Sequence, residues 1–357
     1  MNFNTVFTRS IRFLLLPFAL LYGLIVAIRN WLYNKKIIRS ASFNFPIICI
    51  GNLSVGGTGK SPMVEYLVEL LQAHFKVATL SRGYKRKTKG YALANEATTA
   101  LEIGDEPMQF HLKFPNVAIA VGEERLVAVP QLLHDRPETE VIVLDDAFQH
   151  RAISAGLNIL LTDYNNPFYH DWFLPTGDLR DERRSYKRAQ IIVVTKCPAA
   201  VSVDEMTAIA KQIKLQKGQH LFFTTIHYGQ PYHIVTKQPA ALTSQQEVLL
   251  VCGIANPQPL KNYLTAQVAS FTEQSYNDHH IFTIDDLKDI RKKYGQLQSR
   301  DKLILTTEKD AVRLLKFKDE LQDLPLYVLP VRHQFLFGEG EQFNQLVQNF
   351  VTHFKNS

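Results

Sequence analysis

The segment that decides the fold reads Gly51-Asn52-Leu53-Ser54-Val55-Gly56-Gly57-Thr58-Gly59-Lys60-Ser61-Pro62. It follows an apolar run of strand type, residues 45–50, and precedes residues 63–71, in which apolar side chains recur at helical spacing. A glycine-rich turn between a strand and a helix is typical of a phosphate-binding loop, because glycines let backbone N–H groups turn toward phosphate oxygens. The segment therefore predicts that the chain binds a nucleoside triphosphate.

The side chains of this loop have separate predicted roles. Lys60 is expected to reach the β- and γ-phosphates and to act in catalysis, and Ser61 is expected to bind Mg²⁺. Ser54 replaces the first glycine of the usual G-x-x-x-x-G-K-[ST] pattern. A similar double glycine occurs in membrane-associated partitioning ATPases, but Val55 occupies the position of their signature lysine. The predicted nucleotide-binding residues are Ser54, Val55, Gly56, Gly57, Thr58, Gly59, Lys60 and Ser61, with ATP and Mg²⁺ as the expected cofactors.

Paired carboxylates occur at two further places. Asp145 and Asp146 end the apolar strand pattern of residues 141–144, as in a Walker B strand, whose aspartate holds Mg²⁺ directly or through water. Asp105 and Glu106 lie together just before a proline, and Glu106 is a third candidate carboxylate ligand of Mg²⁺. The alternatives with a purely structural role are a strand-end turn for the first pair and an N-terminal helix cap for the second.

The basic charge is confined to one end of the chain. The whole chain carries a net charge of +6, and the first 40 residues alone hold six basic residues and no acidic one. A nucleic-acid-binding protein would spread basic side chains over its folded domain. We therefore expect no nucleic-acid partner.

The same end contains an uncharged apolar run at residues 13–28, followed by Trp31. As a helix of 1.5 Å per residue it is about 24 Å long, against a hydrocarbon core of about 30 Å, so it would dip into a membrane or span it with strain. Cationic and aromatic flanks suit the membrane surface. A cleaved signal peptide and a buried core helix are the alternatives. The candidate lipid-contacting residues are Arg12, Arg29, Trp31, Lys35 and Lys36.

The rest of the chain alternates strand and helix patterns. Runs of β-branched residues without polar alternation indicate strands covered on both faces, hence an α/β fold with a mostly parallel sheet. We expect an N-terminal membrane helix over residues 1–40, a P-loop core over 41–215, and a second, smaller α/β lobe over 216–357, with a hairpin-like crossover near 220–240. The three cysteines, with no metal-binding spacing, indicate buried thiols in a reducing compartment.

Seven motifs in order, together with the apolar N-terminal helix, resemble the tetraacyldisaccharide 4′-kinase family of lipid A biosynthesis. They cover the chain from this helix to about residue 335. They are the phosphate loop, Ser81-Arg82-Gly83-Tyr84, Gly104-Asp105-Glu106-Pro107, Asp145-Asp146-Ala147-Phe148-Gln149-His150, Leu174-Pro175-Thr176-Gly177, the segment from Phe271 to Asp278-His279-His280, and Thr307-Glu308-Lys309-Asp310.

The resemblance implies transfer of the ATP γ-phosphate to the 4′-hydroxyl of an acylated glucosamine disaccharide 1-phosphate, forming lipid IVA at the cytoplasmic face of the bacterial inner membrane. It implies that Asp105 is the catalytic aspartate and that Asp145 and Asp146 are the Walker B pair. Its histidine partner is expected at His279, with His280 as the alternative. No protein partner is implied.

The chain departs from the family pattern in two places. Ser61 replaces the usual threonine, and residues 174–180 read Leu-Pro-Thr-Gly-Asp-Leu-Arg instead of Leu-Pro-Ala-Gly-Pro-Leu-Arg. The second departure affects only expected contacts with the acceptor. The competing hypothesis is a membrane-associated regulatory ATPase or GTPase that acts through partner binding, and it predicts little need for Asp105 or His279.

Overall fold

The computed structural model describes residues 12–356. A nine-stranded sheet in the order β14-β8-β7-β6-β1-β5-β2-β4-β3 forms the centre of the first domain. Its inner strands are parallel, and the two edge strands β3 and β14 are antiparallel to their neighbours. The strands are β1 (Ile47–Asn52), β2 (Val77–Ser81), β3 (Ala92–Leu93), β4 (Ala118–Val121), β5 (Val141–Leu144), β6 (Leu157–Asp163), β7 (Ile191–Thr195), β8 (His220–Tyr228) and β14 (Val331–Phe335).

Helices cover both faces of this sheet, because alternate residues of its buried strands point to opposite sides. In β1, Ile48 and Ile50 pack into the core on the α3 and α12 face, whereas Ile47 and Cys49 pack into the core on the α6 face. The helices of this domain are η1 (Phe13–Leu15), α2 (Leu16–Asn34), α3 (Lys60–Gln72), α4 (Ala100–Ile103), α5 (Asp105–Lys113), α6 (Arg125–Asp135), η2 (Arg183–Arg188), α7 (Val203–Ile213) and α12 (Gly340–Asn356).

The second domain, residues 229–330, is built on a five-stranded sheet in the order β11-β10-β12-β13-β9. Strand β9 alone is antiparallel to its neighbour. Its elements are β9 (Tyr232–His233), β10 (Glu247–Cys252), α8 (Gln258–Gln267), β11 (Ser270–Ser275), α9 (Ile284–Gln296), β12 (Lys302–Thr307), α10 (Glu308–Leu314), η3 (Leu315–Phe317), α11 (Lys318–Leu321) and β13 (Leu326–Leu329).

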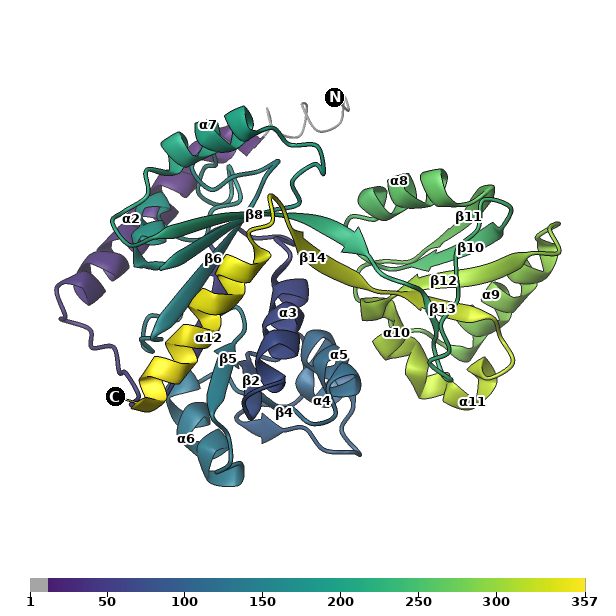
Figure 1. The fold of residues 1–357 in the computed structure, drawn as a ribbon, viewed down its shortest axis with the longest axis horizontal. Coiled ribbons are helices and arrows are strands. Elements are labelled where there is room, and N and C mark those ends of the chain that lie inside the picture. The colour runs from purple at the N-terminus through teal and green to yellow at the C-terminus, as the bar shows by residue number, and fades with distance from the viewer. Residues whose placement is uncertain (1–11, 357) are drawn as a thin grey trace.

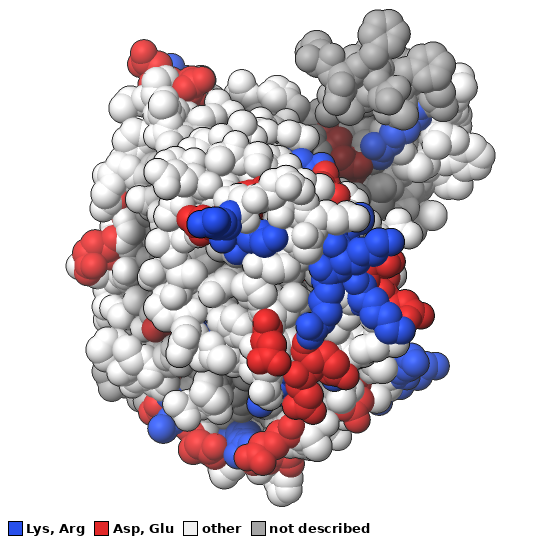
Figure 2. Space-filling view, turned by 90° about the vertical axis from the view of Figure 1, so that its right-hand side faces the viewer, with Lys and Arg blue, Asp and Glu red and all other residues white. Residues whose placement is uncertain are grey.

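Two antiparallel strands, β8 and β14, connect the domains (Figure 1). Figure 2 faces the second domain and shows a group of Lys and Arg side chains beside a group of Asp and Glu, with uncharged side chains over most of this face. The α/β class, the mostly parallel sheet and the apolar N-terminal helix expected from the sequence are confirmed.

The expected domain boundaries differ from the structure. Residues 220–228 form β8 of the large sheet, and residues 331–335 and 340–356 return to the first domain as β14 and α12 (Figure 1). The second domain is therefore inserted between β8 and β14. The expected hairpin near residues 220–240 is wrong, because β8 pairs with a strand much later in the chain. Residues 1–11 of the expected anchor and residue 357 lie outside the described residues.

Candidate active site

The phosphate loop connects β1 to α3, and its neighbours hold it in place. The Val55 N–H donates to the carbonyl of Asp178 at 2.7 Å, and the Thr195 hydroxyl donates to the carbonyl of Thr58 at 3.0 Å. Ser54 and Thr58 are buried, Gly59, Lys60 and Ser61 are half-buried, and Val55, Gly56 and Gly57 are exposed. The middle of the loop is thus open to a ligand, while its two ends are anchored.

Lys60 points toward the end of the neighbouring strand. Its Nζ lies 3.4 Å from Asn52 Oδ1 and 3.8 Å from Asp146 Oδ1. Because Lys60 begins α3, its ammonium lies at the positive end of the helix, where anions are favoured. The arrangement suits a polyphosphate.

A histidine from the connecting strand β14 contacts the backbone of the phosphate loop. His333 Nε2 lies 2.8 Å from the Gly59 carbonyl oxygen, and Nδ1 lies 3.0 Å from the Thr224 hydroxyl. Burial lowers the pKa of His333 to about 4, so the ring is neutral. Because a carbonyl can only accept, Nε2 carries the hydrogen and the Thr224 hydroxyl donates to Nδ1. Gly59 has φ +81°, and a Cβ there would lie 2.9 Å from the ring, so the contact requires glycine.

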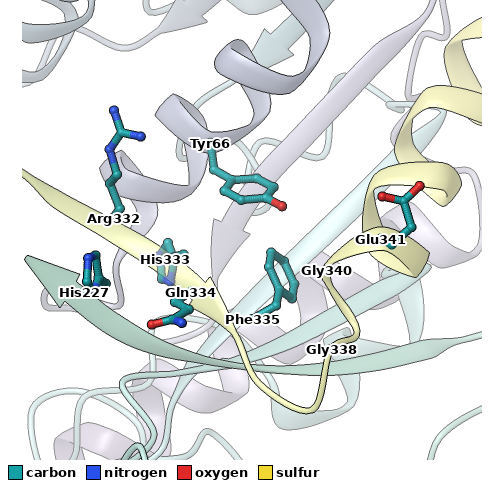
Figure 3. A pocket seen from close by; sticks show the side chains of 9 residues that line it. All are labelled: Tyr66, His227, Arg332, His333, Gln334, Phe335, Gly338, Gly340 and Glu341. Atoms are coloured by element: carbon teal, nitrogen blue, oxygen red, sulfur yellow. The ribbon is translucent and has the colours of Figure 1, made fainter. Parts of the chain in front are cut away.

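His333 also lines a hollow between α3, β14 and the start of α12 (Figure 3). Its volume is about 480 Å³. Tyr66, Arg332 and Glu341 contribute to its lining. None of the predicted catalytic or metal-binding residues lines it. The candidate active site is therefore elsewhere, on the side of the phosphate loop where Lys60 faces the paired aspartates.

Those aspartates have opposite environments. Asp146 has φ +48° and pairs with Arg180 through both carboxylate oxygens, one of them 3.1 Å from Nη1. Burial opposes its ionisation, but Lys60 and Arg180 together hold the pKa of Asp146 below its usual value. In contrast, burial and the adjacent charge of Asp146 raise the pKa of Asp145 to about 7.

The oxygen ligands of this region fit Mg²⁺. Asp145 Oδ1 is buried and has no hydrogen-bond partner among the described residues, and Glu106 lies close enough for its charge to raise the pKa of Asp145. Glu106 Oε1 is 3.8 Å from the ammonium of Lys309. Across residues 12–356, no three His, Cys, Asp or Glu side chains group closely enough to form a metal site. In proteins Mg²⁺ usually takes one or two carboxylates plus phosphate and water.

Asp105 and His279 meet although they belong to different domains. Asp105 begins α5, and Gly104 before it has φ +95°. His279 lies in the turn between β11 and α9 and has φ +66°. Its Nδ1 is 2.7 Å from Asp105 Oδ2. The turn geometry at both residues brings an aspartate and a histidine into direct contact.

Arg313 of α10 holds the same carboxylate. Its Nε donates to Asp105 Oδ1 at 3.0 Å, and its Nη2 donates to Oδ2 at 2.5 Å. Burial opposes ionisation of Asp105, but Arg313, followed by His279, lowers the pKa of this carboxyl below its usual value. Asp105 is therefore a carboxylate at neutral pH.

The tautomer of His279 follows from its contacts with Asp105 and Lys309. A carboxylate only accepts, so Nδ1 carries the hydrogen that faces Asp105. At the opposite side of the ring, the ammonium of Lys309 lies 3.2 Å from Nε2 and can donate to it. His280 instead pairs with Asp286 at 3.0 Å, within the second domain. The structure thus brings His279, and not His280, to Asp105.

The predicted lipid-contacting residues fall into two groups. Arg12 pairs with Asp178 at 2.9 Å, and Arg29 donates to the Gln149 carbonyl at 2.6 Å, so both are held by the protein. Trp31, Lys35 and Lys36 are exposed. Helix α2 with η1 forms a segment, Phe13–Asn34, that is long and apolar enough to cross a membrane, and only 22% of its most apolar window is buried.

Several site residues were not predicted. Arg180 and Asn52 stand next to the Lys60 and Asp146 contact, with Arg180 Nη2 2.5 Å from Asn52 Oδ1. Both residues lie in segments quoted in the sequence analysis, residues 51–62 and 174–180, so these motifs could have indicated them. Arg313 lies on a short helix with no local signal that distinguishes it from a surface arginine.

Comparison with known proteins identifies the family. The family model described as tetraacyldisaccharide-1-P 4′-kinase (LpxK) matches residues 11–352. A tetraacyldisaccharide 4′-kinase of Flavobacterium johnsoniae is 45% identical over 96% of this chain and 97% of its own length, and one of Bacteroides thetaiotaomicron is 43% identical over 94% and 92%.

The fold is similar to a solved structure of the same family. A crystal structure of LpxK from Aquifex aeolicus in complex with ATP matches with a TM-score of 0.75 and 28% identity. The match covers 96% of this chain and 99% of the other. Since the family model and the relatives extend over nearly the whole sequence, the resemblance seen in the motifs is confirmed, and the chain belongs to the tetraacyldisaccharide 4′-kinase family.

Proposed function

We propose that this chain transfers the γ-phosphate of ATP to the 4′-hydroxyl of an acylated glucosamine disaccharide 1-phosphate, forming lipid IVA in lipid A biosynthesis. The observation that carries the proposal is the contact between Asp105 and His279, 2.7 Å apart, in a chain whose phosphate loop faces two further aspartates. Nucleotide binding alone needs no such pair. A pair of this kind suits an acceptor with a hydroxyl proton to be held and moved.

The nucleotide end of the reaction is assigned to the first domain. Amide groups of the open part of the loop and the Lys60 ammonium would surround the β- and γ-phosphates and offset the charge that develops on them. Ser61, Asp145, Asp146 and Glu106 would hold Mg²⁺, which supplies further neutralisation of the phosphate oxygens. Arg180 keeps Asp146 ionised and fixes its direction.

The acceptor end is assigned to Asp105. Its Oδ1 accepts one hydrogen bond, from Arg313 Nε, so a lone pair remains for a sugar hydroxyl. A carboxylate with a lowered pKa is a weak base, which suits phosphoryl transfer, because the loose transition state needs an oriented hydroxyl more than an early proton transfer. His279 and Arg313 would then act as positioning residues for Asp105.

The exposed face of α2 would keep the enzyme beside its acceptor. Leu20, Leu24 and Ile28 are 62%, 56% and 50% exposed and follow one another at helical spacing. Burial of such a face in a leaflet supplies membrane affinity, and anionic lipids would attract Lys35 and Lys36 at the cytoplasmic surface of the inner membrane.

The test is phosphate transfer by the purified full-length chain with labelled ATP, Mg²⁺ and the disaccharide 1-phosphate in detergent micelles. We expect one labelled lipid product, and no transfer to a matched acceptor that lacks the 4′-hydroxyl. Labelled product from the 4′-deoxy acceptor would place the reaction at another oxygen. Hydrolysis of ATP without any lipid product would favour the regulatory ATPase.

A further inference from the structure

Helices α5 and α10 come from different domains and lie side by side with oppositely charged ends paired. Asp105 at the start of α5 meets Arg313 near the end of α10, with Nη2 and Oδ2 2.5 Å apart. At the other end, Lys113 closes α5 and meets Glu308, the first residue of α10, with Nζ and Oε1 2.8 Å apart. The two helices therefore run antiparallel and are joined at both ends.

The Lys113 end is a buried network. Lys113 Nζ also lies 2.5 Å from Glu65 of α3, the helix that follows the phosphate loop. The exposed fractions of the Glu65, Lys113 and Glu308 side chains are 3%, 19% and 7%. Two carboxylates share one ammonium, and burial, followed by the charge of Glu308, raises the pKa of Glu65 to about 7. Buried charges of this kind need partners in fixed positions, because desolvation makes an unpaired one costly.

Glu308 also connects this network to the strand that joins the domains. Its second carboxylate oxygen, Oε2, accepts the backbone N–H of Val331, the first residue of β14, at 3.0 Å. One side chain therefore contacts α5 through Lys113 and the connecting strand through Val331. Both neighbours belong to the first domain, whereas Glu308 belongs to the second.

Helix α10 carries two side chains that lie beside His279. Lys309 Nζ lies 3.2 Å from its Nε2 and can donate to it, whereas Arg313 Nη2 lies 3.0 Å from its Nδ1 because both groups donate to Asp105 Oδ2. The position of α10 against α5 therefore determines where His279 stands relative to Asp105. If the Lys113 end is loosened, the ion pairs that still join α10 to α5 are those of Arg313 with Asp105 and of Lys309 with Glu106, both at the start of α5, so α10 can change its angle.

We propose that the Lys113 and Glu308 pair is a remote positioning element that fixes α10 against α5 and so holds His279 at Asp105. The pair touches no predicted nucleotide or acceptor group. Its effect on turnover rests on the proposed function, whereas its effect on the geometry of His279 does not. The role of the pair can therefore be tested by kinetics, through kcat, and by spectroscopy, through the state of His279.

The principal variant is Glu308→Gln, which keeps an acceptor for Val331 and leaves Lys113 paired with Glu65. We expect kcat to fall by about three- to tenfold, which lies within the range of about 2- to 30-fold for coupling through a remote element, with the dissociation constant of ATP unchanged. In a His279→Ala background the same substitution should change kcat less than about twofold, because residues that act through one another are not additive. Lys113→Met should act in the same direction.

The matched control is Lys261→Met, which removes an ion pair with Glu273 that lies inside the second domain. Its effect on kcat should be small in both backgrounds. An equal loss from Glu308→Gln with and without His279 would overturn the proposal, since a general loss of stability acts in both backgrounds. An unchanged kcat in Glu308→Gln would overturn it as well.

The second readout is nitrogen NMR of ¹⁵N-labelled histidine in the full chain, assigned by His279→Gln. In the wild type we expect the Nδ1–H tautomer at His279, and in Glu308→Gln a shift toward a mixture of tautomers. An unchanged His279 signal would contradict the proposal whether or not the enzyme turns over. A wild type with the expected signal but no lipid product would count against the proposed function instead.

Discussion

His279 Nδ1 lies 2.7 Å from Asp105 Oδ2, although 174 positions separate the two residues in the sequence. His279 belongs to the inserted second domain, and Asp105 is the first residue of α5 in the P-loop domain. The pair therefore exists only while the two domains are in contact. Any change that separates them should reduce phosphate transfer more than it reduces ATP binding.

Lys60→Ala should lower kcat by at least about 10²-fold, because the transferred phosphate loses its principal cation in the transition state. The chain should remain folded with a lower melting temperature, because Lys60 is one of the two cations that hold the pKa of the buried Asp146 down. Steady-state kinetics and thermal unfolding check the two parts. Near-normal turnover would refute the assignment of the phosphate loop.

Asp145→Asn should stabilise the fold at alkaline pH when Mg²⁺ is removed. The pKa of Asp145 is raised from 3.8 to about 7 in the folded chain, so the wild type loses stability as pH rises between these values and no further above them. The gain from Asp145→Asn should therefore be larger at pH 8 than at pH 5. Urea unfolding with EDTA at both values measures it.

Asp146→Asn is the matched control, because its neighbour has the opposite shift. The pKa of Asp146 is lowered by Lys60 and Arg180, so its ionised form stabilises the folded state above the usual pKa and this contribution is lost on acidification. Asp146→Asn should thus destabilise the fold at pH 8. If both substitutions change the free energy of unfolding in the same direction at pH 8, the environments assigned to Asp145 and Asp146 are wrong. Both variants should also need more Mg²⁺ for turnover.

Replacing Leu20, Leu24 and Ile28 by Ser should release the chain from anionic vesicles. The change removes exposed apolar area worth about 25 cal/mol per Å² when buried, so binding should weaken by at least about tenfold. Deletion of residues 1–35 is a less specific test, because it also removes buried packing residues such as Gly23 and the buried Asn30, which donates to Asp181 at 2.7 Å.

Vesicle sedimentation at fixed lipid concentration is the measurement for the α2 variant, with ATP affinity as a check on the fold. The control is Leu101→Ser, which removes a side chain 47% exposed on α4. That variant should sediment like the wild type. Full sedimentation of the triple variant would show that another surface holds the membrane.

The strands β1, β2, β4, β5, β6 and β7 of the large sheet could be predicted because they are short apolar runs, buried on both faces, between glycine or charged turns. The phosphate loop was predictable for a related reason, since its glycines and Lys60 are local features of the sequence. The pairing of β8 with β14 was not, because the match of Thr224 with Phe335 depends on a register between distant segments. A single sequence contains no local signal for such a register.

The residues of the candidate site also divide into those that the sequence predicts and those that depend on contacts between distant segments. Asp105 and His279 could be predicted as partners only through the family resemblance, because no local pattern relates two residues that lie 174 positions apart. Arg313 was missed because an arginine in a helix normally extends into solvent, and only the antiparallel packing of α10 on α5 directs it to Asp105. The domain boundary was missed because α12 is an amphipathic helix that fits either lobe by its sequence alone.

A double-mutant cycle on kcat tests whether Asp105 and His279 act as one unit in phosphate transfer. Asp105→Ala and His279→Ala should each lose most of kcat and keep ATP affinity, with His280→Ala as the control that changes kcat little. We expect the double variant to be at most about twofold worse than the worse single variant, because groups that act as a unit are not additive. Losses that multiply across the cycle, or a larger loss at His280 than at His279, would contradict it.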